Sequence, residues 1–188
     1  MKDLFDPNDN REIIERIGKL LPSAQAQWGK MHVAQMLAHT QMPLRYALGE
    51  LKLKRNLGSV SVSAVKTYVL TDTVECQEEI PDITNQLCSI ETLPKSVRDT
   101  LRPHHIEKLT SGKPWRHSMP TNPNFVVADE REFEKERKQL IALVQRFPQS
   151  GPSAITKEAH PFFGKMNPQE WSTLQWNHLN HHLTQFGV

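Results

Sequence analysis

The segment from residue 167 to residue 188 has the pattern of a helix whose buried side ends in histidines. Asn167, Pro168 and Glu170 predict its start, because they fit an N-cap, a proline at the first helical position and the glutamate of a capping box. The residues that follow recur at three- and four-residue steps, which is the period of one helix face. Polar groups on a buried face are costly unless something binds them. The stripe consists of Trp171, Leu174, His178, Gln185 and either His181 or His182.

Three imidazoles lie within about one and a half turns of this helix: His178, His181 and His182. His178 and His182 are four residues apart, so they stack on one face and can both reach a single divalent metal ion. The spacing of His178 and His181, three residues apart, allows an alternative pair. Gln185 is expected to orient a histidine or a bound water rather than to ligate, because metal-bound imidazoles usually donate their other N–H to a partner.

An earlier helix, expected from about Met31 to Leu51, offers a third ligand. His39 lies at the edge of its apolar side, three residues after Met36, and could point into a bundle. His32 is nearly on the same face but about 10 Å away along the axis, so only one of the two can serve the same ion. His39 lies deeper in the periodic run and is the preferred candidate.

Three protein ligands with a fourth position left for water are typical of a catalytic zinc-type site, whereas structural sites usually close with four. Cys76 and Cys88 are not included, because they are far apart in a poorly patterned segment and form no Cys-x-x-Cys motif. The cofactor expected is therefore a divalent metal ion, with Zn, Ni or Fe as the candidates.

Two more helices complete the predicted fold. The first begins at Asn8–Asn10 and ends at Pro22, with an apolar face that includes Leu21. The third is capped by Asp129, and its apolar residues face inward while Glu130, Glu132, Glu134, Glu136 and Lys138 face outward. On the last helix, Trp176 is expected on the flank of the buried stripe. Pro43 should kink or end the second helix, which would change the direction in which the His39 side chain points.

The expected architecture is all-α: a single domain, 1–188, built as an antiparallel four-helix bundle with an irregular region at about 52–128. Residues 59–63 and 67–71 have a strand-like local preference, and 93–101 suggests a short amphipathic helix. Residues 57–111 are longer than a usual interhelical connection and are interpreted as an insertion or a lid.

These motifs resemble the DinB-like (YfiT-like) superfamily of metal-binding four-helix bundles. More specifically, the chain looks like an uncharacterised branch, a domain of unknown function. The resemblance covers roughly residues 10–50 and 112–188. It rests on Trp28-Gly-Lys-Met31 leading to His39, on Met119-Pro-Thr121, on His160-Pro-Phe-Phe-Gly-Lys-Met166, and on the final block from Glu170-Trp171 to Gln185-Phe-Gly-Val188.

The superfamily resemblance implies a specific ligand set. One histidine of the second helix and a His-x3-His-x2-Gln stretch of the last helix hold the ion, which gives His39, His178 and His182 here. Better-known relatives are thiol-dependent transferases and isomerases in which the metal activates a small thiol. No reaction is assigned to this branch, so an activity taken from them is an analogy from fold.

Composition limits the classes of partner. The net charge is +2 and 23% of the residues are charged, which is too balanced to indicate nucleic-acid or membrane binding. No apolar run approaches the ~20 residues that span a bilayer, and the N-terminus lacks the pattern of a signal peptide. Two cysteines without a framework suit a reducing compartment, so a cytoplasmic location is expected.

Two functions therefore compete. The first is a metal-dependent enzyme, a transferase or hydrolase acting on a small-molecule substrate at a three-histidine ion site. The alternative is a non-catalytic helical scaffold or binding module, whose histidines form a hydrogen-bonded or purely structural cluster. A homodimer is compatible with both.

Overall fold

Four long helices make up most of the chain that the computed structural model describes, which is residues 1–52, 106–107, 109–117, 123–160 and 163–188. They are α1 (Pro7–Lys19), α2 (Val33–Ala47), α5 (Phe133–Ser150) and α6 (Pro168–Gln185). Two short 3-10 helices accompany them, η2 (Pro123–Phe125) and η3 (Pro152–Ala154). No β-strand occurs among these residues, so the all-α class is confirmed.

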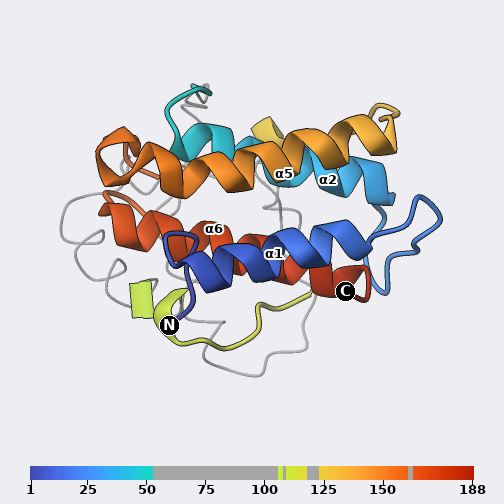
Figure 1. The fold of residues 1–188 in the computed structure, drawn as a ribbon, viewed down its shortest axis with the longest axis horizontal. Coiled ribbons are helices and arrows are strands. Elements are labelled where there is room, and N and C mark those ends of the chain that lie inside the picture. Colours follow the sequence, from blue (N-terminus) through green and yellow to red (C-terminus); the bar gives the residue numbers. More distant parts are fainter. Residues whose placement is uncertain (53–105, 108, 118–122, 161–162) are drawn as a thin grey trace, which may run out of the picture.

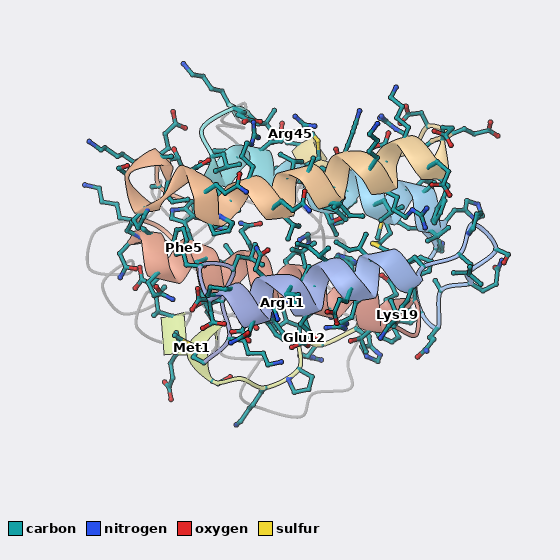
Figure 2. The ribbon with its side chains drawn as sticks, viewed as in Figure 1. Met1, Phe5, Arg11, Glu12, Lys19 and Arg45 are labelled. Carbon is teal, nitrogen blue, oxygen red and sulfur yellow. The ribbon has the colours of Figure 1, made fainter. Side chains whose placement is uncertain are left out.

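The helices form a bundle around one core. Contacts run in a ring from α2 to α5, from α5 to α1, from α1 to α6 and from α6 back to α2. Figure 1 shows α2 and α5 as one layer above α1 and α6. At one end of the space between the layers, Phe5 (Figure 2) packs against Phe147 with ring centroids 5.3 Å apart.

The uniformly antiparallel order that the sequence predicted is not confirmed. Figure 1 shows α1 and α6 running in one direction and α2 and α5 in the other, so two of the contacting pairs are parallel. Side-chain bonds agree with this register, since Gln35 reaches the Asp129 carbonyl and Gln41 reaches Glu136 farther along both helices. A parallel pair needs a long return connection, and residues 48–132 between α2 and α5 supply one.

The first helix begins earlier than predicted. Asp6, rather than the segment Asn8–Asn10, is the N-cap: its carboxylate accepts from the backbone N–H groups of Asn8 at 2.8 Å and of Asp9 at 3.1 Å. Pro7 then takes the first helical position, where its missing N–H costs nothing. Because α1 ends at Lys19, Leu21 lies beyond it and is 63% exposed, against the prediction that it belongs to the apolar face.

The second helix continues through its proline. α2 is one helix from Val33 to Ala47 with Pro43 inside it, and the expected break does not occur. Pro43 removes one backbone hydrogen bond. The burial of Leu37, Leu44 and Ala47, none of which is exposed, outweighs that loss.

The third long helix differs from prediction at its start and on one face. Glu132, not Asp129, is the N-cap of α5, accepting from the N–H groups of residues 134 and 135. Glu136, expected to face outward, is only 4% exposed. Its Oε2 accepts from Gln41 Nε2 at 2.7 Å, and Arg131 lies 3.6 Å from its other oxygen. These partners explain how a carboxylate is tolerated between α2 and α5.

The last helix begins as predicted. Asn167 Oδ1 accepts from the Glu170 N–H at 2.8 Å, and Glu170 Oε2 accepts from the Asn167 N–H at 2.7 Å, which completes the capping box. Trp171 is fully buried, as expected. Trp176 is also buried, at 7% exposed, because α1 covers that side of α6 and the Asp9 carbonyl accepts from its indole N–H.

Several expectations lie outside the described residues: the strand-like segments 59–63 and 67–71, the short helix at 93–101, and most of the region 57–111. Within 112–117, which is described, no regular secondary structure occurs. No helix in the described part of the chain is long and apolar enough to cross a membrane.

Candidate metal centre

Three histidines from two helices meet inside the bundle. His39 lies in the middle of α2, while His178 and His182 lie one turn apart on the antiparallel α6. Their ring centroids form a nearly equal triangle, 5.0 Å from His39 to His178, 4.9 Å from His39 to His182 and 4.7 Å from His178 to His182. The interior of the bundle therefore brings together the three imidazoles that the sequence singled out.

The nitrogen atoms of this triad are spaced like ligands of one ion. One ring nitrogen from each of the three residues lies within 4.8 Å of the others. The Nε2 atoms of His39 and His178 are 3.2 Å apart. Tetrahedral coordination with metal–nitrogen bonds of ~2.0–2.1 Å places ligand atoms about 3.3 Å from one another. The cluster is thus of a size that can hold a divalent ion.

A backbone carbonyl fixes the His39 ring. The Phe125 oxygen, at the end of η2, lies 2.9 Å from His39 Nδ1. A carbonyl can only accept, so Nδ1 carries the proton and the Nε2 lone pair faces the other two rings. This is the arrangement in which a histidine orients its free nitrogen toward a metal.

A side-chain amide fixes the His182 ring in the same way. Gln185 Oε1 lies 2.8 Å from His182 Nδ1, and Gln185 Nε2 donates to the Trp28 carbonyl. Because the amide N–H is used by Trp28, the oxygen is left to accept the Nδ1 proton of His182. The backbone N–H of Gln27 also donates to the Gln185 carbonyl at 2.8 Å, so the segment before α2 holds the end of α6.

His178 is held differently from the other two. Its Nε2 faces His39 Nε2, which has no proton, so in the ion-free protein His178 Nε2 is the donor. Its Nδ1 is buried and makes no hydrogen bond in the structure described. In the triad, the Nδ1 atoms of His39 and His182 therefore have a hydrogen-bond partner, whereas Nδ1 of His178 has none among the described residues.

Burial keeps all three imidazoles neutral. Burial, helped by the neighbouring His39 ring, lowers the pKa of His182 to about 3. Burial lowers the pKa of His178 well below its usual range, with His182 and His39 adding to the effect. Burial also lowers the pKa of His39, against the hydrogen bond to Phe125. Neutral imidazole is the form that ligates a metal.

Four further rings lie beside the triad; we call Trp28, Trp115, His117 and His181 the aromatic rim. Trp28 and His117 stack with centroids 3.8 Å apart and planes at 8°. His181 lies 5.7 Å from Trp28 and 6.0 Å from Trp115, centroid to centroid. Trp115 also faces His178, at 6.1 Å. His181, a candidate alternative ligand, thus packs with the other rings of the rim and is not part of the ligand-spaced set.

The remaining described histidines are not part of the ligand-spaced set, although His160 helps to lower the pKa of His178. His32 is exposed at the N-cap of α2. His160 pairs with Gly164 through two backbone hydrogen bonds of 2.8 and 2.9 Å and packs edge-on against Trp171, which fits a turn leading into α6. Burial lowers the pKa of His160 to about 3. His104, His105 and both cysteines lie outside the described residues.

Of the groups that orient or border the triad, the sequence pointed only to Gln185 and His181. The Phe125 carbonyl carries no signal in the sequence, since any residue supplies one. Trp28 and Trp115 could have been suspected, because large aromatic side chains in loops outside the apolar helix faces are unusual. Nothing in the pattern showed that they approach His178 and His181.

Gly29 offers a direct test of the Gln185 contact. Its φ is +81°, and a Cβ added there would lie 2.7 Å from Gln185 Nε2. We expect Gly29→Ala to lower the free energy of unfolding through strain and to displace the amide that orients His182. Gly49 has a similar φ of +73° and open space around it, so Gly49→Ala isolates the backbone strain.

We expect the control to cost about 1–2 kcal/mol, and Gly29→Ala to cost about 1 kcal/mol more, the value of one hydrogen bond. Urea unfolding of both variants measures this difference. Equal losses in the two variants would show that Gln185 adapts freely and does not depend on Gly29.

The sequence comparisons bear on the C-terminal half. Searches of curated proteins and of solved structures gave no match. A family profile matches residues 91–187, slightly more than half of the chain, and this range includes His178 and His182 but not His39. On this match, the chain belongs to the family described as "Protein of unknown function (DUF1569)".

Proposed function

We propose that this protein binds one divalent metal ion through His39, His178 and His182 and uses it on a small-molecule substrate. The observation that carries the proposal is the convergence of three neutral imidazoles, one nitrogen of each within 4.8 Å of the others. The donor set fits the ion: two of the rings already have their Nδ1 protons bound, to Phe125 and to Gln185, and so offer Nε2.

The number of ligands supports a reactive rather than a structural centre. Structural zinc sites usually use four protein ligands, whereas catalytic sites keep one position open. Imidazole ligands suit zinc, nickel and iron, and any of these would supply a Lewis acid or lower the pKa of a bound thiol or water. The chain's own contribution is to hold three neutral nitrogens in place and to surround them with apolar rings.

The aromatic rim indicates the side from which a substrate could reach the triad. Trp115 lies next to His178 and His181, and His117, which is exposed, lies over Trp28. Flat, partly exposed rings beside an ion-binding cluster suit a small organic molecule better than a polymer. We therefore infer that the substrate approaches the triad past the rim.

A DinB-like origin is part of this proposal. The positions of the ligands, one on α2 and two on α6 with Gln185 three residues after His182, follow the pattern of that superfamily, as does a bundle of four long helices. By analogy the reaction is a thiol-dependent transfer or a hydrolysis, with fold as its only basis.

One observation favours a different function. His178 Nε2 donates to His39 Nε2 at 3.2 Å, so the cluster can satisfy part of its hydrogen bonding without an ion. A hydrogen-bonded core of this kind suits a non-catalytic scaffold or binding module. The two proposals differ in whether the purified protein contains metal.

Elemental analysis of the protein from a metal-replete host tests the main proposal. We expect about one zinc, nickel or iron per chain, and consumption of a low-molecular-weight thiol in a screen across electrophiles. Metal-free protein that also fails to take up added zinc would contradict the proposal. It would favour the alternative, a non-catalytic scaffold or binding module.

A further inference from the structure

Helix α6 carries an unusual number of buried polar atoms without partners. In the described structure, Trp171 Nε1, Thr173 Oγ1, both amide atoms of Gln175 and His178 Nδ1 are buried and make no hydrogen bond. Gln175 has no exposed surface at all. Buried polar groups are nearly always paired in native proteins, so each exception needs an explanation.

Two of these atoms lie on one side of the helix. Gln175 precedes His178 by three residues, and side chains at this spacing share a face. Side chains on a helix also lean toward its N-terminus, so the His178 ring lies over the turn that contains Gln175. By this spacing, we expect the unpartnered amide of Gln175 and the unpartnered ring nitrogen of His178 to be neighbours on the buried side of α6.

Binding of an ion changes what His178 requires. Without an ion, its Nε2 holds the proton and donates to His39 Nε2. If His178 held an ion through Nε2, its single ring proton would have to lie on Nδ1. A buried N–H then needs an acceptor, which the ion-free arrangement does not give it.

We propose that Gln175 is a positioning residue of the metal centre, whose amide oxygen accepts the Nδ1 proton of His178 once the ion is bound. This inference rests on the proposed function. A glutamine already serves His182 in this way at the same spacing, although Gln185 follows its histidine by three residues whereas Gln175 precedes His178 by three. The terminal torsion of a glutamine is broad, so a turn of the amide into this position is inexpensive. Each ligand histidine would then have its own partner: Phe125, Gln185 and Gln175.

Gln175→Leu is the decisive variant. It keeps the size of the side chain and removes both unpartnered amide atoms, so the ion-free protein should be as stable as the wild type or more so. Zinc affinity, measured by competition with a chromophoric chelator, should fall about 10- to 100-fold. Gln175→Met, with a similar volume and a flexible chain, is a second variant in case the leucine disturbs packing.

Thr173→Val is the matched control. Its hydroxyl is equally buried and unpartnered, but two residues along a helix place it on the opposite side of α6 from Gln175. We expect it to change stability in the same direction as Gln175→Leu and to leave zinc affinity unchanged.

Nitrogen-15 spectra of the histidine rings give an independent readout. In the wild type, zinc should move the His178 proton from Nε2 to Nδ1, and the Nδ1–H signal should show a hydrogen bond that Gln175→Leu removes. A wild-type protein that is purified without metal and also takes up no added zinc overturns the proposed function. A wild type that binds zinc, with affinity and ring signals unchanged in both Gln175 variants, overturns the role of Gln175 alone.

Discussion

Replacing His178 with alanine should abolish stoichiometric metal in protein purified from a metal-replete host. The substitution removes one of the three ring nitrogens and leaves only His39 and His182, which cannot complete a three-nitrogen site. The loss should exceed the about 10- to 100-fold that follows when a residue that merely orients a ligand is removed. His182→Ala should behave alike, and elemental analysis measures both.

Two histidine controls make this result specific. His181→Ala removes a ring of the aromatic rim, and His32→Ala removes an exposed ring at the start of α2. Both should retain the metal content of the wild type. Full metal in His178→Ala would show that the triad is not the site. Loss of metal in His181→Ala, with retention in His182→Ala, would shift the ligand set to the alternative pair on α6.

Acid should destabilise the metal-free protein at pH values where ordinary carboxylates are still ionised. The pKa of His182 is about 3 in the folded state against 6.5 for a free histidine. Below pH 6.5, His182 therefore becomes protonated in the unfolded chain, whereas in the folded chain it stays neutral down to about pH 3. The stabilisation is complete above pH 6.5 and is lost as the pH falls toward 3. His182 alone should lower the free energy of unfolding by about 2 kcal/mol at pH 5.

The groups that face His182 are imidazoles, namely His39 from α2 and His178 and His181 from its own helix. The pKa values of all three are also lowered, so their effects have the same sign. Urea unfolding in the presence of a chelator, from pH 8 to pH 5, measures the total. His182→Gln should reduce the slope of the free energy of unfolding with pH. A free energy that stays constant over this range would mean that the cluster is hydrated and accessible to protons.

The parts of the fold that follow from local rules could be predicted from the sequence. The Asn167–Glu170 capping box and the four-residue spacing of His178 and His182 depend only on helix geometry. The position of His39 on the buried side of α2 follows from the apolar periodicity around it. For this reason the convergence of three imidazoles could be predicted from helix periodicity together with the family resemblance.

The remainder depends on contacts between distant parts of the chain. Glu136 is buried because Gln41 of another helix binds it, and Trp176 because α1 lies against it. The parallel course of α2 and α5 depends on how residues 48–132 return the chain. The Phe125 carbonyl reaches His39 across 86 residues of sequence. No periodicity within one helix encodes such partners.

The separation of His39 and His178 in the chain has a consequence during biosynthesis. These residues are 139 positions apart, so at ~5–20 residues per second a ribosome needs roughly seven to thirty seconds to pass from one to the other. Under the proposed function, the three-nitrogen site can therefore form only after α6 has been synthesised.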